Sequence, residues 1–167
     1  EYQSLLKSND YNLVYKKAIE YYNKGDYQRA MNLLDGVRSV FVGQAKAQNI
    51  AYYRAFCSYN MKDYQIASDL FKQFIQTYPE SSFAEECLYM MGFCDYKASP
   101  KPRLDQQVTE KAIREFQLYL SRYPYSMRKD KVNTYMDEMR DKLSYKAYLS
   151  AKNYYLREHY KAAVISL

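Results

Sequence analysis

The feature that most constrains this chain is a repeated segment. Residues 52–59 read Tyr-Tyr-Arg-Ala-Phe-Cys-Ser-Tyr, and a near copy, Tyr-Met-Met-Gly-Phe-Cys-Asp-Tyr, occupies residues 89–96, which lie 37 residues later. A weaker copy lies 37 residues earlier, where Tyr15 and Tyr22 take the two outer tyrosine positions. Self-similarity at a fixed period of this size indicates a stacked array of structural repeats.

Each copy predicts a helix with an aromatic stripe. A tyrosine, an apolar residue and a second tyrosine stand at i, i+4 and i+7, which places them on one helix face. A small residue at i+3 lies beside that face. The three rows are Tyr15, Ile19 and Tyr22, then Tyr52, Phe56 and Tyr59, and then Tyr89, Phe93 and Tyr96.

A second helix follows each of the first two stripes. The turn Gly25-Asp26-Tyr27, repeated as Lys62-Asp63-Tyr64, ends one helix and caps the next. Small residues on both helices let the pair pack closely. These predicted positions are Ala18, Ala30, Ala55, Ala67, Gly92, Ala112, Ala151 and Ala163. The pattern is typical of the tetratricopeptide repeat of about 34 residues, and it predicts an all-α, right-handed solenoid of antiparallel helix pairs.

The repeats divide a single domain, residues 1–167, into units at about 10–43, 44–80 and 81–125, after a short tether. A long helix at 126–157 then starts a truncated fourth repeat, and we expect more protein to follow it. The third unit carries an insertion, 98–106, because Tyr96 and Ala112 are 16 residues apart where Tyr59 and Ala67 are eight apart. Two prolines predict a stiff, extended excursion, either a plain surface loop or a partner contact.

Composition favours a protein-binding surface. The chain has 22 tyrosines and no tryptophan, and tyrosine can pack its ring while its hydroxyl stays in water. The net charge is +6, but basic and acidic residues alternate, so we expect no nucleic-acid partner. The densest basic group, Arg128, Lys129 and Lys131, is interrupted by Asp130 and is interpreted as a solvated helix face.

Catalytic and metal-binding patterns are missing from the sequence. It has no Gly-rich phosphate loop, nucleophile elbow or His-Glu-x-x-His motif, and Glu85 and Glu86 are interpreted as exposed. We therefore expect neither an enzyme nor a cofactor. His159 is the only histidine, and a zinc site would lack its usual partners. The three cysteines, Cys57, Cys87 and Cys94, are predicted to be packed, reduced thiols.

The three aromatic rows form the candidate binding site. In stacked two-helix repeats the first helices line the concave face, so the rows would lie parallel in a groove. An aromatic stripe is also what a core contains, and both interpretations stay open. Tyrosine at six of the nine places favours a groove whose hydroxyls meet an extended peptide. Asn23 and Asn60, with Lys97 in the third copy, would form a weak polar rim.

Beyond the general repeat, the chain resembles the BamD family, the tetratricopeptide lipoproteins of the β-barrel assembly machinery. The resemblance rests on Gly25-Asp26-Tyr27 with Ala30, Tyr78-Pro79-x-Ser81 before Phe83-Ala84, the insertion from Ser99 to Gln106, Arg122-Tyr123-Pro124-x-Ser126, and the run from Asp141 through Tyr154-Tyr155 to Ala163. It implies three complete repeats out of five.

This resemblance also implies a function and partners. A member would sit on the periplasmic face of the outer membrane, held by a lipidated cysteine upstream of Glu1. It would receive unfolded outer-membrane proteins in the groove and dock to a BamA-like barrel-forming subunit. Two alternatives are a generic tetratricopeptide adaptor and a glycan-binding envelope lipoprotein that stacks sugars on the tyrosines.

Overall fold

The computed structural model describes residues 2–165, without the side chains of residues 162, 163 and 165. Within this part the chain forms eight helices and no strand. The helices are α1 (Tyr2–Leu5), α2 (Tyr11–Asn23), α3 (Tyr27–Val37), α4 (Ala45–Asn60), α5 (Tyr64–Thr77), α6 (Ala84–Ala98), α7 (Gln107–Arg122) and α8 (Lys129–Ile165).

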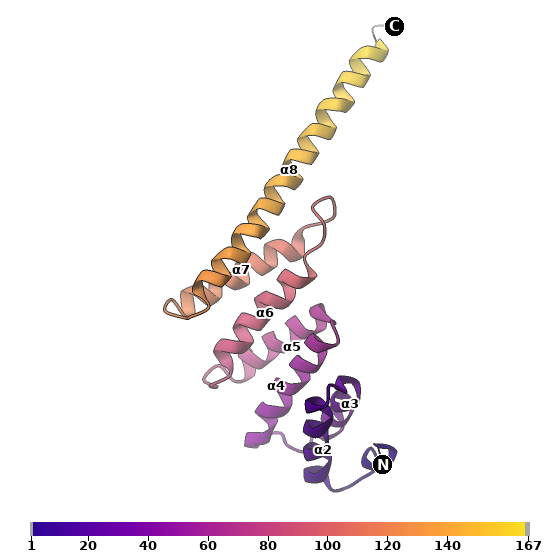
Figure 1. Cartoon of the computed structure of the whole chain (residues 1–167), viewed down its shortest axis with the longest axis vertical. Coiled ribbons are helices and arrows are strands. Elements are labelled where there is room, and N and C mark those ends of the chain that lie inside the picture. Colours follow the sequence, from indigo (N-terminus) through magenta and orange to yellow (C-terminus); the bar gives the residue numbers. More distant parts are fainter. Residues whose placement is uncertain (1, 166–167) are drawn as a thin grey trace.

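The helices stack as antiparallel pairs, α2 with α3, α4 with α5 and α6 with α7 (Figure 1). Each pair also packs on the next, through α3 against α4 and α5 against α6, and α7 packs against α8. The predicted all-α solenoid is therefore confirmed.

The turns inside the first two pairs share left-handed backbone but differ in capping, because Asp63, expected to cap α5, makes no side-chain cap hydrogen bond. Asp10 caps α2 by accepting a hydrogen bond from the Leu13 backbone N–H at 3.0 Å, and Asp26 accepts one from the Arg29 N–H at 3.3 Å. Gly25 ends α2 with a φ of +81°, whereas Lys62 takes the equivalent place after α4 with a φ of +66°. The second turn therefore adopts left-handed backbone without a glycine, at a steric cost that the surrounding packing offsets.

Small residues set the distance between paired helices, as predicted, in all three complete repeats. Ala18, Ala30, Ala55, Ala67 and Ala112 are fully buried. Gly92 is the closest approach, because a Cβ there would lie 2.8 Å from the Phe116 ring.

The two C-terminal small positions differ from these. Ala151 is exposed, since no second helix packs beside this part of α8 in the described chain. Ala163 lies outside the residues whose side chains are described.

The termini depart from the predicted boundaries. The predicted tether contains a one-turn helix, α1, whose Leu5 is buried against the first repeat. Helix α8 was expected over 126–157, yet it runs unbroken from Lys129 to Ile165. Its first half packs on α7, and Val132, Met136 and Met139 enter the core. Its second half, residues 145–165, projects away from the body, and we call it the arm (Figure 1).

The insertion folds back against α8 instead of extending into solvent. Its buried Gln106 donates amide hydrogen bonds to the carbonyls of Lys101, at 2.8 Å, and Leu104, at 3.1 Å. From α8, Lys142 Nζ donates to Ser99 Oγ and Lys146 Nζ to the Leu104 carbonyl, each at 2.7 Å. The loop is compact because its own Gln106 amide and Lys146 satisfy backbone carbonyls, and Lys142 holds the Ser99 side chain.

Candidate functional site

The predicted rows come together as a continuous band of half-buried rings across α4 and α6, joined to α2. Tyr52 and Phe56 have ring centroids 4.6 Å apart, and Tyr59 reaches Phe93 of the next repeat at 6.1 Å. Tyr53, which the sequence pattern did not single out, bridges the first two rows by contacting Tyr22 at 4.9 Å. We call the nine row residues together with Tyr53 and Tyr135 the aromatic band.

The third row is covered more than the others. Tyr89 keeps only 7% of its surface exposed, while Phe93 and Tyr96 are half-buried. The cover is Tyr135 of α8, whose ring lies 4.4 Å from that of Tyr96 and 5.5 Å from that of Phe93. Counting 37 residues from the third row does not find Tyr135, and adding the eight inserted residues leads from Tyr89 to Thr134, one residue short of it.

Hydroxyl groups of the band are tied to neighbouring helices. Tyr52 donates to Glu86 Oε2 at 3.0 Å, and Tyr96 donates to Glu138. The hydrogen bond to Glu138 and burial raise the pKa of Tyr96 to about 12. Burial raises the pKa of Tyr22 to about 12, although a hydrogen bond with Asn60 works against this rise. The band therefore uses these hydroxyls to join repeats, and fewer are free for a ligand than predicted.

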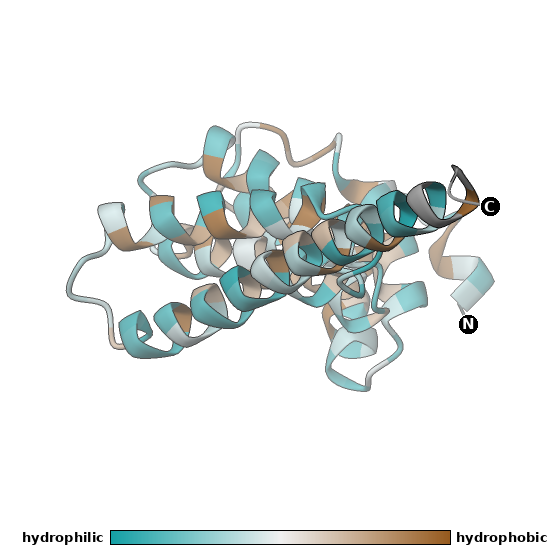
Figure 2. Ribbon diagram, turned by 90° about the horizontal axis from the view of Figure 1, so that it is seen from above, coloured by the Kyte–Doolittle hydropathy of each residue, from teal (hydrophilic) through white to brown (hydrophobic). Residues whose placement is uncertain are grey.

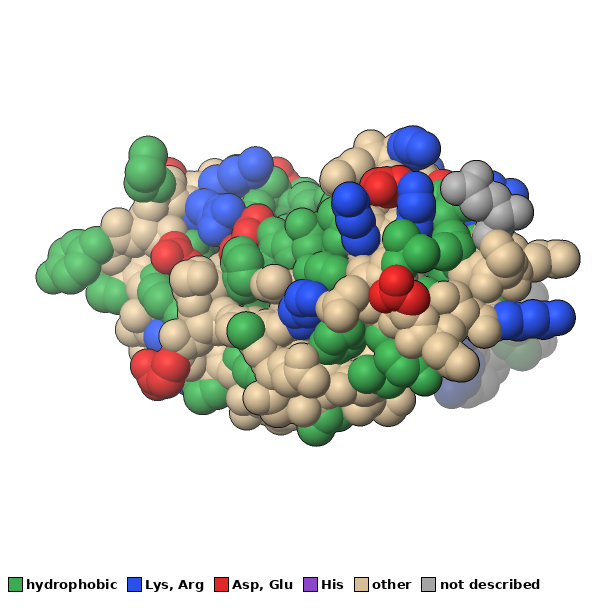
Figure 3. All heavy atoms as spheres, turned by 90° about the horizontal axis from the view of Figure 1, so that it is seen from below, with side chains coloured by type: hydrophobic (Ala, Val, Ile, Leu, Met, Phe, Trp, Pro, Cys, Tyr) green, Lys and Arg blue, Asp and Glu red, His purple; other side chains and the backbone are tan. Residues whose placement is uncertain are grey.

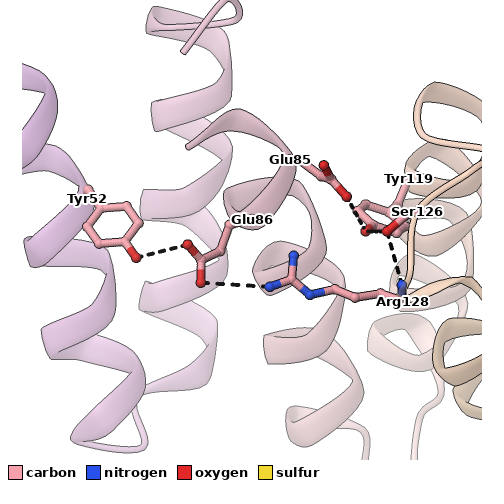
Figure 4. A network of polar contacts seen from close by, with 6 residues as sticks. All are labelled: Tyr52, Glu85, Glu86, Tyr119, Ser126 and Arg128. Carbon is pink, nitrogen blue, oxygen red and sulfur yellow. Dashed lines mark hydrogen bonds and ion pairs between the residues drawn. The ribbon is translucent and has the colours of Figure 1, made fainter. Parts of the chain in front are cut away.

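The interpretation of Glu85 and Glu86 as exposed residues is wrong, because both belong to a polar network at the start of α6 (Figure 4). Glu86 accepts from Tyr52, and Glu85 accepts from Tyr119 at 3.0 Å. Tyr52 precedes its acid by 34 residues and Tyr119 follows its acid by 34, so no repeated spacing marks these pairs in the sequence. Both acids lie in the first turn of α6, where their negative charge interacts favourably with the positive end of the helix dipole.

Cations lie over the rings of the third row and its cover. Arg128 stands 4.8 Å from the Tyr89 ring centroid, Lys131 lies 5.9 Å from that of Tyr135, and Lys97 lies 5.3 Å from that of Phe93. The interpretation of the 128–131 group as a plain solvated face is thus wrong for Arg128, which is half-buried, whereas Lys131 is exposed as expected and also lies near a ring. Interactions of this kind are worth about 0.5–1 kcal/mol at exposed sites.

The predicted polar rim is only partly at the band. Asn60 is half-buried and donates from Nδ2 to the Phe56 carbonyl at 2.9 Å, whereas Asn23 is exposed. Ile19 is half-buried on α2, and Tyr15 lies 6.2 Å from the Phe41 ring. The first row therefore meets the rest of the band through Tyr22 and Tyr53.

A buried ionic cluster lies apart from the band, between α6 and α7. Lys111 Nζ is 2.8 Å from Asp95 Oδ2 and 3.7 Å from Glu115 Oε1. Burial, together with hydrogen bonding and repulsion from Asp95, raises the pKa of Glu115 to about 8. A carboxyl that keeps its proton at neutral pH can donate to Asp95, which lowers the cost of burying both acids.

The described residues hold no group of three or more His, Cys, Asp and Glu side chains suited to a metal ion. All three cysteines are buried and unpaired, and burial raises the pKa of each thiol to about 12. None of the helices in residues 2–165 has the length and apolar character needed to cross a bilayer.

Hydrophobic and basic side chains share part of the molecular surface. Figure 3 shows one face on which hydrophobic side chains gather, with Lys and Arg side chains between them. Such a face combines apolar contact area with positive charge, and both features suit a protein partner.

Comparison with known protein families gives a match over almost the whole chain. Residues 7–166 match the model of the YfiO family, described as outer membrane lipoprotein. None of the curated proteins matches the chain.

Proposed function

Because this chain belongs to the YfiO family of outer membrane lipoproteins, we propose that it is a scaffold and receptor for unfolded outer-membrane proteins during their assembly. In this proposal a lipid at the N-terminal side of the chain anchors it to the periplasmic face of the outer membrane. Its docking partner is a BamA-like barrel-forming subunit.

The aromatic band is the observation that carries the receptor role. Its rings come from four helices, yet they contact one another in an unbroken series from Tyr22 to Tyr135. Most of them are half-buried, so each offers part of its surface while its neighbours hold it in place. Rigid, half-buried aromatic rings supply contact area at a low entropic cost, which suits an extended segment that brings alternating apolar side chains.

Ring geometry favours a peptide over a stacked sugar. Sugar stacking needs an open ring face, but Arg128, Lys131 and Lys97 lie over three of the rings. Neighbouring rings of the second row take edge and tilted arrangements, as between Tyr52 and Tyr53, with an interplanar angle of 88°. The glycan-binding alternative therefore has less support from the structure than the peptide-binding one.

The test is binding of an unfolded outer-membrane protein segment to the double variant Tyr52→Ala/Phe56→Ala. We expect its affinity to fall by about tenfold or more, because two central rings are lost. Circular dichroism must show a folded variant. The control is Tyr154→Ala/Tyr160→Ala, which removes two exposed rings from the arm. Unchanged affinity in the folded band variant would refute the assignment.

If the double variant does not fold, the single substitution Tyr59→Ser tests the same assignment. Tyr59 is half-buried, and its hydroxyl has no hydrogen-bond partner among the described residues. It contacts Phe93, so its loss opens the band between the second and third rows. Equal binding by this variant and the unaltered protein would count against the same assignment. Competition with a glycan panel separates the peptide site from a sugar site.

A further inference from the structure

Two cations at the N-terminal end of α8 lie over rings at one end of the aromatic band. Arg128 and Lys131 are three residues apart, and they stand over the rings of Tyr89 and Tyr135. These two tyrosines interact with each other: burial, and then the proximity of Tyr135, raise the pKa of Tyr89. The tyrosine pair therefore places two positive charges at one end of the band.

Within the chain, Arg128 forms a weak ion pair with Glu86. Its guanidinium Nη2 lies 4.0 Å from Glu86 Oε1, and 39% and 37% of the two side chains are exposed (Figure 4). The other carboxylate oxygen of Glu86 accepts the hydroxyl of Tyr52 at 3.0 Å. A longer, half-exposed ion pair of this kind contributes little to stability, so a ligand can replace it.

The remaining cations of this region have no carboxylate of their own. Lys131 and Lys97 form no ion pair within the described residues. The nearby acid Glu138 accepts the hydroxyl of Tyr96. Neither lysine is therefore held by an ion pair, so both ammonium groups are available to an added carboxylate.

We propose that Arg128 and Lys131 bind a carboxylate of an extended segment that lies on the aromatic band. When no segment is bound, Glu86 forms the ion pair with Arg128. The inference rests on the proposed function, because the segment must lie on the band first. It adds a chemical preference for segments that carry an acidic group among aromatic and apolar residues. An arginine and a lysine side by side can donate several charge-assisted hydrogen bonds to one carboxylate.

The test uses three rhodamine-labelled peptides in which Phe and Tyr alternate with Ser and Thr. The first has a central Glu and an amidated C-terminus, and the second has Gln in place of Glu. The third is the Gln peptide with a free C-terminal carboxylate. Fluorescence anisotropy gives the three affinities for the whole chain at low and high salt. We expect the Glu peptide to bind about fivefold more tightly than the amidated Gln peptide, and less so at high salt.

Three variants assign the effect to named residues. Arg128→Gln and Lys131→Gln should each remove most of the preference for the Glu peptide while leaving the Gln peptide unchanged. The matched control is Arg122→Gln, an exposed arginine at the end of α7. Glu86→Gln should tighten the Glu peptide, because it frees Arg128 and still accepts the Tyr52 hydroxyl. A merely structural Glu86 would not give this gain.

The outcomes separate the two proposals. Equal binding of all three peptides, with a loss in Tyr52→Ala/Phe56→Ala, would overturn the carboxylate site and leave the receptor function standing. No binding of any peptide would overturn both. A gain only for the free C-terminal carboxylate would support the site and identify the terminal group as its ligand, whereas a gain only for Glu would identify a side chain.

Discussion

The body of the solenoid and the arm have the same kind of sequence and opposite environments. Tyr119 in the body is fully buried, whereas Tyr155 and Tyr160 in the arm keep 62% and 73% of their surface. The difference is a neighbouring helix. Tyr119 is enclosed by α6 and the start of α8, while no described helix packs beside residues 145–165. Figure 2 shows hydrophobic and hydrophilic residues mixed along α8. A tyrosine-rich helical pattern therefore does not by itself determine burial.

The strongest test of this difference is the same substitution, tyrosine to alanine, made once in the body and once in the arm. Tyr119→Ala removes a fully buried ring whose hydroxyl bonds to Glu85, and it should lower the free energy of unfolding by about 3–5 kcal/mol. The matched change in the arm, Tyr155→Ala, should stay within about 0.5 kcal/mol. Urea denaturation followed by circular dichroism measures both values. A similar loss in the two variants would mean that another surface covers the arm.

The second largest difference between body and arm should be in how the stability depends on pH, through the titration of Glu115 in the body. Glu115 has its pKa raised from 4.5 to about 8, so between these pH values the folded state keeps a proton that the unfolded state has released. Its stabilising contribution is present below about pH 4.5 and is lost as pH rises towards 8.

Glu115→Gln should therefore lose less stability than the unaltered protein between about pH 5 and 8, by on the order of 1–2 kcal/mol. Urea midpoints at several pH values measure this difference. The control is Glu158→Gln in the arm, whose pair with Lys161 is exposed and 3.9 Å long. Parallel pH profiles for Glu115→Gln and the unaltered protein would contradict the assignment of this proton to the core.

The smallest expected effect lies at the junction of body and arm. Lys146 donates to the Leu104 carbonyl, so Lys146→Ala should loosen the insertion and cost less than about 1 kcal/mol. Amide hydrogen exchange of residues 101–106 should become faster. Lys152→Ala, which changes an exposed lysine without a partner among the described residues, should leave that exchange unaltered. Unchanged exchange in Lys146→Ala would show that Gln106 and Lys142 order the loop without it.

Some features of the aromatic band could be predicted from the sequence and others could not. The spacing of Tyr52, Phe56 and Tyr59 predicted rings on one helix face, and the structure places them together in the band. The role of Tyr135 was hidden because it lies one residue beyond the place that the repeat, with its eight-residue insertion, gives to the next copy of Tyr89. The contacts of Arg128 were hidden because a basic residue in an alternating charge pattern looks like any solvated one.

The sequence by itself determined the local elements and their pairing. Periodicity, caps at Asp10 and Asp26, and small residues such as Ala55 and Gly92 act within a helix or between successive helices, so they leave a readable signal. Only the tertiary structure decided which rings are covered, which hydroxyls join repeats and which cations lie over rings. These properties depend on distances between residues such as Tyr89 and Arg128, which are far apart in the chain. They arise from how the helices stack, and a single helix does not encode them.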